Sequence, residues 1–274
     1  MKILITGHEG FIGKNLASYL KYKGHEVEGW EYIENSWPDP AKYDRVIHCG
    51  AISSTTERDV EKVLKQNYEF TMKLIELCDM MGTSLQYSSS ASVYGPGEDG
   101  FRENSKCYPQ SAYAWSKYMV DRFVGNHLND FMINIQGFRY FNVYGNHEDH
   151  KGEQASPVTK FTKQAKEDGE IKLFVGSENY LRDFISVQDI CLVHEKMLET
   201  DTSGIFNLGT GGTTSFKEIA NVIAKKYDAV VKEISMPAKL KGQYQEYTCA
   251  DMEKLSKVCP HQYIRVQDWI YEQK

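Results

Sequence analysis

The sequence has no long basic run, no long apolar run and no C-x-x-C pair. The net charge is -6 and the lysines are interleaved with acids, so the electrostatic footprint of a nucleic-acid-binding protein is missing. No apolar run is long enough to span a bilayer, and Met1 leads directly into a short apolar strand instead of a signal-peptide core. These absences predict a cytoplasmic protein without a membrane or nucleic-acid partner.

Metal binding is also disfavoured. The six cysteines are scattered without the spacing of a metal knuckle, and His147 and His150 flank two acids in a predicted loop without a metal-ligand spacing. We therefore expect no metal site. With 274 residues, 41% of them hydrophobic and 26% charged, the chain can bury one large core or two modest ones.

The first residues match a dinucleotide-binding turn. A short apolar run from Lys2 to Thr6 is followed by Gly7, Gly10 and Gly13 and then by a helical pattern. Such glycines let the backbone turn tightly and approach a pyrophosphate, which the N-terminus of the following helix faces with N–H groups. A purely structural turn is the alternative, but the position between a strand and a helix favours cofactor binding.

Glu31 follows the second predicted strand, where an acid can bind an adenosine ribose. A carboxylate there favours NAD because it repels the 2′-phosphate of NADP; an exposed glutamate at a strand end is the other interpretation. The segment between Glu31 and Asp44 is too short for a full helix and another strand. The sequence thus predicts an α/β protein with a doubly wound parallel sheet (a Rossmann fold) that lacks one strand and helix.

The next buried strand is predicted from Arg45 to Ala51, and a helix with an apolar stripe runs from there to Gly82. Ser54 and Glu57 have the spacing of a capping box and predict the start of this helix. Asn67, inside the helix, is either a cofactor-side amide or a plain polar position.

Tyr113 and Lys117 stand four residues apart in a predicted helix, so both side chains lie on one face. We expect the lysine cation to lower the pKa of the phenol, so that it can take a proton from an alcohol. Ser90, in a serine-rich loop after the preceding strand, is placed to bind the same hydroxyl. Tyr19 and Lys23 have the same spacing but lie at the polar end of an amphipathic helix, where we expect a solvated rim.

Beyond residue 141 the alternation of strands and helices loosens, without a repeat or an evident linker. We expect a smaller substrate-binding lobe interleaved with the dinucleotide-binding domain. The expected boundaries place 1–141 and about 183–208 in the dinucleotide-binding domain, and 142–182 and 209–274 in the lobe.

The glycine turn, Ser90, Tyr113 and Lys117, in this order, resemble an extended short-chain dehydrogenase/reductase, the family of nucleotide-sugar epimerases and dehydratases. Other segments narrow the resemblance to its ADP-glycero-manno-heptose 6-epimerases. These are SSTTE from Ser53, FRYFNVYG from Phe138, HKG from His150, KLFVGSEN from Lys172, RDF from Arg182, SGIFNLGTG from Ser203 and LKGQYQ from Leu240.

The resemblance implies sites for a cofactor and a substrate. Positions that match cofactor contacts are Gly7, Gly10, Phe11, Ile12, Gly13, Glu31, Cys49, Gly50, Ala51, Ser53, Asn67, Tyr113, Lys117 and Val143. Positions that match substrate contacts are Ser90, Asn142, Phe174, Gly176, Ser177, Arg182 and Tyr244. The expected cofactor is NAD(P), because Glu31 favours NAD whereas the family implies NADP.

The implied reaction is redox epimerisation of a nucleotide-diphosphate sugar. A bound nicotinamide takes a hydride from C6 while a base takes the hydroxyl proton, and the hydride then returns to the other face of the ketone. The resemblance assigns Tyr113 and Lys151 as the two acid/base groups, with Lys117 on the nicotinamide ribose and Ser90 beside the reacting oxygen. It also implies a homo-oligomer.

The chain departs from the family pattern at Glu153, where the family has a serine, and at Lys160, where it has a histidine. An acid near a diphosphate is unfavourable unless paired, and Lys160 is the candidate partner. The alternative is a UDP- or GDP-hexose C4-epimerase or another extended short-chain dehydrogenase acting on a nucleotide sugar. The intact Ser90, Tyr113 and Lys117 argue against a third interpretation, a non-catalytic NAD-binding protein.

Overall fold

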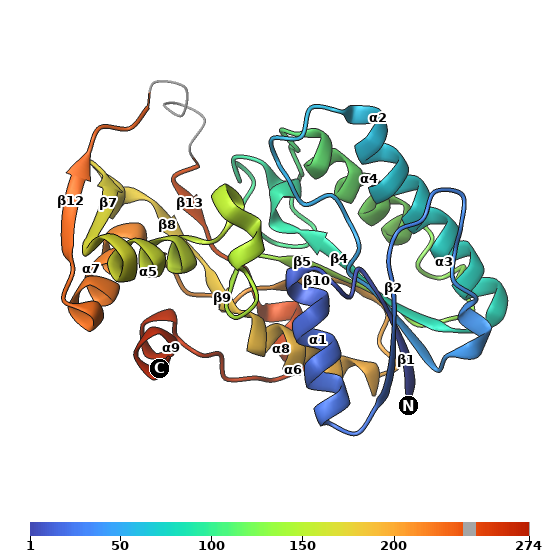
Figure 1. The fold of residues 1–274 in the computed structure, drawn as a ribbon. Coiled ribbons are helices and arrows are strands. Elements are labelled where there is room, and N and C mark those ends of the chain that lie inside the picture. Colours follow the sequence, from blue (N-terminus) through green and yellow to red (C-terminus); the bar gives the residue numbers. More distant parts are fainter. Residues whose placement is uncertain (238–244, 274) are drawn as a thin grey trace. The chain divides into compact units, whose positions relative to one another are not determined.

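The structure, a computed structural model, describes residues 1–237 and 245–273 and divides into two compact units (Figure 1). Unit 1 comprises 1–140, 191–207 and 253–261, and unit 2 comprises 141–190, 208–252 and 262–274. The chain crosses between the units close to the expected positions 141 and 208, but 183–190 lies in unit 2 and 253–261 in unit 1. Lys254 ties the latter segment to unit 1, because its Nζ donates to the carbonyl of Ile205 at 2.8 Å.

Unit 1 contains a six-stranded sheet in the order β10-β5-β4-β3-β1-β2. The strands are β1 Lys2–Thr6, β2 Glu26–Trp30, β3 Arg45–His48, β4 Ser84–Ser90, β5 Ile135–Tyr140 and β10 Gly204–Leu208. The pairs from β2 through β1, β3 and β4 to β5 are all parallel. The predicted α/β fold with a parallel sheet is confirmed.

Strand β2 is the edge of this sheet, and the chain passes from it to β3, on the other side of β1. The connection contains a 3₁₀ turn at Pro40–Lys42 in place of a helix and a strand. Two aromatic side chains of the connection pack on Phe70: Tyr32 edge-on at 5.6 Å and Trp37 stacked at 6.2 Å between ring centroids. The predicted loss of one strand and helix is confirmed, since the connection between β2 and β3 contains only this 3₁₀ turn.

Helices cover both faces of the sheet in unit 1 (Figure 1). One face packs against α1 (Phe11–Tyr22) and α6 (Val187–Leu198), and the other against α3 (Phe70–Met81) and α4 (Ala112–Asn126). The alternation of side chains along β1 sets this division, since Ile3 and Ile5 join the α1 cluster and Leu4 joins the α3 cluster.

The capping box predicted at Ser54 and Glu57 is wrong. The helix α2 (Val60–Val63) begins later and is capped by Asp59, whose side chain accepts the N–H of Lys62 at 3.0 Å. Side chains such as those of Ser54 and Glu57 also accept backbone N–H groups in turns, so their spacing alone does not mark a helix start. A π-helical turn, Leu64–Glu69, then joins α2 to α3.

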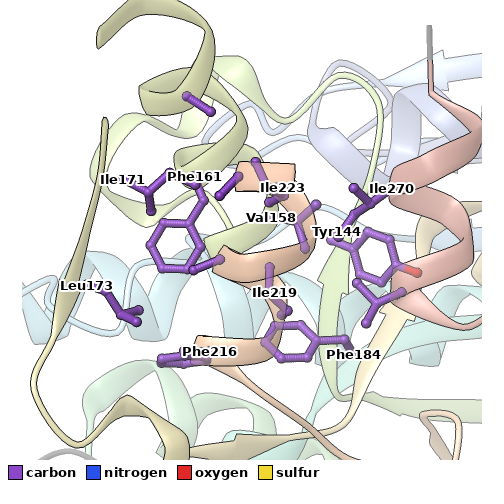
Figure 2. Packing of buried hydrophobic residues seen from close by; sticks show 14 of the residues in the cluster. Tyr144, Val158, Phe161, Ile171, Leu173, Phe184, Phe216, Ile219, Ile223 and Ile270 are labelled. Carbon is purple, nitrogen blue, oxygen red and sulfur yellow. The ribbon is translucent and has the colours of Figure 1, made fainter. Parts of the chain in front are cut away.

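Unit 2 surrounds a separate core (Figure 2). Its strands are β6 Asn142–Tyr144, β7 Glu170–Phe174, β8 Leu181–Arg182, β9 Phe184–Ser186, β11 Thr214–Ser215, β12 Val230–Ile234 and β13 Tyr247–Thr248, and its helices are α5 Pro157–Asp168, α7 Phe216–Tyr227 and α9 Val266–Glu272. Phe161, Ile171, Phe184, Ile219 and Ile270 meet in this core.

Unit 1 also holds the short α8, Glu253–Val258. Within the described ranges, no helix is long and apolar enough to cross a membrane.

Candidate active site

Three residues predicted from the sequence meet in unit 1, where the end of β4 approaches α4. Ser90 is the last residue of β4, and its hydroxyl is close enough to the phenol of Tyr113 to lower the pKa of that phenol. Lys117 lies one turn further along α4, and its Nζ donates to the carbonyl of Ser88 at 2.8 Å. Ser111 caps this helix, so the position of Tyr113 is fixed within the first turn of a regular element.

The two titratable groups of this cluster are strongly affected by burial. Burial raises the pKa of the Tyr113 phenol, and the nearby Ser90 hydroxyl acts in the opposite direction. Burial also lowers the pKa of Lys117 to about 8. The expected lowering of the phenol pKa is wrong for this structure, because burial dominates and the ammonium is bound to the Ser88 carbonyl.

Tyr19 and Lys23, the other pair with this spacing, have a different environment. The Tyr19 hydroxyl donates to the carboxylate of Glu195 at 2.6 Å, and Lys23 Nζ lies 3.5 Å from the same carboxylate. The lysine is exposed at the end of α1. The pair therefore forms a small ionic cluster at a helix end, in agreement with the prediction of a polar rim.

A buried ion pair that the sequence did not indicate supports the Tyr113 cluster. Asp121 accepts from Arg139 Nε at 2.7 Å, from Ser89 Oγ at 2.8 Å and from the Tyr87 hydroxyl at 3.0 Å. Its side chain is 1% exposed. Tyr87 and Ser89 precede Ser90 on β4, so these bonds join the end of the strand to α4. The only signal in the sequence was the position of Asp121 one turn after Lys117.

Asn67 lies in the π-helical turn and is fully buried. Its Oδ1 accepts the N–H of Ile52 at 2.8 Å, and its Nδ2 donates to the Ile52 carbonyl at 3.0 Å and to Ser116 Oγ at 3.1 Å. Ser116 Oγ in turn donates to the carbonyl of Tyr113 at 2.7 Å. Asn67 thus links the loop after β3 to α4, in a kind of helical defect that is frequent at functional sites.

The glycine turn fits the pyrophosphate of a dinucleotide. Gly7 has φ of 72°, and a Cβ there would lie 2.5 Å from Cα of Gly50. A Cβ on Gly13 would lie 2.1 Å from the carbonyl oxygen of Gly7. Only glycine therefore permits this approach between the turn and the loop after β3. Gly10 is the N-cap of α1, so the positive end of the helix faces the turn without a side-chain cap.

Glu31 connects the end of β2 to the glycine turn. Its Oε1 accepts the N–H of Glu9 at 2.9 Å and lies 2.9 Å from Nδ1 of His8. The predicted cofactor positions from Cys49 to Ser53 follow β3, whose carboxyl end lies beside that of β1 in the sheet. The structure therefore brings these predicted positions of unit 1 to one edge of the sheet, where open α/β sheets bind ligands.

Lys151 lies in unit 2, in the irregular 3₁₀ segment Asp149–Gln154. Its side chain is 24% exposed, and its Nζ lies 4.0 Å from the carboxylate of Glu148. Burial lowers the pKa of Lys151, and Glu148 raises it. Glu153 is exposed, and Lys160 Nζ donates to its backbone carbonyl. The expected pairing of Lys160 with the Glu153 carboxylate is therefore wrong, because the lysine binds the backbone carbonyl instead.

The predicted substrate positions of unit 2 lie on β6, β8 and the loop after β7. Arg182, on β8, lies over the Phe216 ring at 5.6 Å and donates to the Leu181 carbonyl at 3.0 Å and to the Gln245 carbonyl. Asn142, on β6, donates through Nδ2 to the Asp183 carbonyl at 3.1 Å.

The loop after β7 is held by Ser177, whose Oγ donates to the carbonyl of Phe174 at 2.5 Å. Gly176 adopts φ of 87° beside it. Val143 pairs with Ile185 between β6 and β9. Tyr244 lies outside the described residues.

Residues 3–209 match the model of the NAD dependent epimerase/dehydratase family. The chain belongs to this family. It is 38% identical over 286 residues to ADP-L-glycero-D-manno-heptose-6-epimerase of Brachyspira hyodysenteriae, which covers 92% of this chain and 90% of the relative. The predicted family and the predicted class of enzyme, an epimerase that uses a nicotinamide dinucleotide, are confirmed.

Solved structures of epimerases have the same fold. The ADP-L-glycero-D-manno-heptose-6-epimerase of Helicobacter pylori has a TM-score of 0.85 and 27% identity, covering 97% of this chain and 92% of that chain. A UDP-glucose 4-epimerase of Thermotoga maritima also has a TM-score of 0.85, with 24% identity, covering 99% of this chain and 96% of that chain. The second likeness concerns the fold alone.

Proposed function

We propose that this member of the epimerase/dehydratase family inverts C6 of ADP-glycero-manno-heptose or a close analogue. One observation carries the proposal: the chain combines the Ser90, Tyr113 and Lys117 cluster in unit 1 with a half-buried lysine, Lys151, in the segment of unit 2 that resembles the heptose epimerases. The 38% identity to a heptose epimerase over nearly the whole chain supports it.

The residues of unit 1 suit a nicotinamide dinucleotide. Gly7, Gly10 and Gly13 would hold the pyrophosphate, Glu31 the adenosine ribose and Lys117 the nicotinamide ribose. When bound, the oxidised cofactor supplies a reversible hydride acceptor for the sugar carbon.

The side chains of the chain itself move the protons. Tyr113 is the first acid/base group and exchanges a proton with the reacting hydroxyl, and Ser90 orients that hydroxyl by a hydrogen bond. Lys151 exchanges a proton with the same oxygen when the sugar presents its other face. A lysine whose pKa is lowered by burial suits this role, because it can both donate and accept a proton closer to neutral pH.

We propose NAD as the cofactor in preference to NADP. The Glu31 carboxylate is held at the end of β2 by the N–H of Glu9, and a 2′-phosphate beside it would be repelled. Denaturing the purified protein and identifying the released dinucleotide by mass spectrometry tests this. Release of NADP alone would contradict the proposal.

The substrate is tested by incubating the pure protein with ADP-D-glycero-D-manno-heptose and following the configuration at C6 by NMR. The Tyr113→Phe variant, prepared in the same way, controls for a contaminating epimerase. UDP-glucose, followed at C4, represents the alternative. Conversion of UDP-glucose without conversion of the heptose would replace the proposed function by the C4 reaction.

A further inference from the structure

Glu148 is a buried carboxylate outside the residues assigned so far, and it closes the loop that contains Lys151. Its Oε1 accepts the N–H of Ser156 at 2.7 Å, and its Oε2 accepts from Ser156 Oγ at 2.7 Å and from Thr159 Oγ1 at 2.6 Å. The side chain is 1% exposed. Three donors converge on two oxygens, an arrangement that suits a carboxylate, which can only accept.

These bonds join the two ends of the segment from 148 to 156. Within it, the N–H of Lys151 donates to the Glu148 carbonyl at 3.0 Å, and the N–H of Ala155 donates to the Gly152 carbonyl at 3.1 Å. Gly152 has φ of 50° and interrupts the helical geometry. The segment therefore lacks a continuous ladder of backbone bonds, and the Glu148 carboxylate supplies its connection to the start of α5.

The same carboxylate faces the lysine. Lys151 Nζ lies 4.0 Å from Glu148 Oε1, and the lysine is much less exposed than a surface lysine. Burial lowers the pKa of Lys151, and Glu148 is the charged group that raises it. The other titratable groups of this segment and of the adjoining turn of α5 are His147, Asp149, His150, Glu153 and Lys160.

We propose that Glu148 is a positioning residue for Lys151: its carboxylate closes the loop that presents the lysine and provides the counter-charge beside the ammonium. This inference rests on the proposed acid/base role of Lys151. A purely structural role is the competing explanation, because Glu148 also supports Ser156, the N-cap of α5.

A second helix cap in unit 2 provides the matched control. Glu218 accepts the N–H of Ser215 at 2.7 Å and Ser215 Oγ at 2.8 Å, the same pair of bonds that Glu148 makes with Ser156. Glu218 is residue N3 of α7 and does not belong to the segment that holds Lys151. Glu218→Gln therefore weakens a cap without changing the charge near Lys151.

The experiment compares Glu148→Gln with Glu218→Gln in the holoenzyme. We expect Glu148→Gln to lower kcat about tenfold to a hundredfold, because a displaced catalytic group loses its alignment. We also expect the limb of the pH–rate profile that belongs to Lys151 to move to lower pH by about one unit, because the opposite charge is removed. Glu218→Gln should leave that limb in place.

A second measurement is independent of turnover. Reductive ¹³C-methylation of the lysines, with the Lys151 signal assigned by Lys151→Arg, gives the pKa of Lys151 by NMR titration. An unchanged pKa in Glu148→Gln, or an equal change in Glu218→Gln, would overturn the proposal. If the wild-type protein converts no nucleotide sugar, the proposed function fails, while this titration still decides whether Glu148 controls the charge of Lys151.

Discussion

Tyr113 lies in a helix of 15 residues that is capped by Ser111, whereas Lys151 lies in a 3₁₀ segment of six residues with an irregular glycine. The end of β4 and the buried ion pair of Asp121 and Arg139 support the helix of Tyr113, and the carboxylate of Glu148 supports the segment of Lys151. In unit 1 regular elements and many contacts fix the position of Tyr113. In unit 2 the side chain of Glu148 provides much of the support for the loop that contains Lys151, so one substitution can displace this loop.

The largest expected effect tests whether the two regions serve one reaction. Tyr113→Phe and Lys151→Met should each lower kcat by roughly 10²–10⁴-fold, because each removes a positioned acid/base group. Both variants should keep the bound dinucleotide. The rates are measured by NMR of the sugar and the cofactor by mass spectrometry. Full activity of Lys151→Met would contradict the proposed acid/base role of Lys151.

The supports of the two regions should differ in their contribution to stability. Asp121→Ala leaves Arg139 buried and unpaired, and we expect a loss of about 3–5 kcal/mol in the free energy of unfolding. Glu148→Ala removes the acceptor of neutral donors and the counter-charge of Lys151, which is partly exposed, and about 1–3 kcal/mol is expected. Urea unfolding of both variants measures this. Equal losses would show that the two supports are equivalent.

We expect buried histidines of unit 1 to make the free energy of unfolding decrease at acidic pH. Burial lowers the pKa of His48 and of His194 to about 3, and both belong to that unit. Between pH 3 and 6.5 the unfolded state then binds more protons than the folded state. The free energy of unfolding is therefore largest above pH 6.5 and decreases as the pH falls, by roughly 1 kcal/mol per histidine and pH unit.

Urea unfolding at pH 7, 6 and 5 checks this dependence. His194→Gln should flatten it, whereas His150→Gln, an exposed position in unit 2, should not. A wild-type protein equally stable at pH 5 and 7 would contradict the expectation.

The smallest effect concerns the pair with the same spacing as Tyr113 and Lys117. Tyr19→Phe removes a hydrogen bond to Glu195 and should cost at most about 1 kcal/mol, because the ionic cluster is only partly buried. The epimerisation rate should not change. A loss of activity similar to that of Tyr113→Phe would mean that spacing, and not environment, selects the reactive tyrosine.

Features that depend on local sequence could be predicted: the glycine turn, the parallel sheet without one strand and helix, and the Ser90–Tyr113 cluster, since periodicity and chain length decide them. Lys151 came only from the family resemblance, because a lysine in an irregular loop has no periodic signal. The supporting carboxylates, Asp121 and Glu148, could not be assigned. Their roles arise from partners that folding brings together, such as Arg139, and burial also reversed the expected direction of the Tyr113 pKa.

The loss of one strand and helix has a consequence for the behaviour of the protein in solution. It leaves β2 at the border of the sheet, where unpaired backbone groups could accept a strand from another molecule and start aggregation. Two exposed side chains of this strand, Glu26 and Glu28, are charged, and Lys2 of the neighbouring strand β1 lies 3.5 Å from Glu26 and 2.9 Å from Glu28. An added strand would desolvate these charges. The charges therefore disfavour pairing at β2, the edge strand that the missing strand and helix leave uncovered.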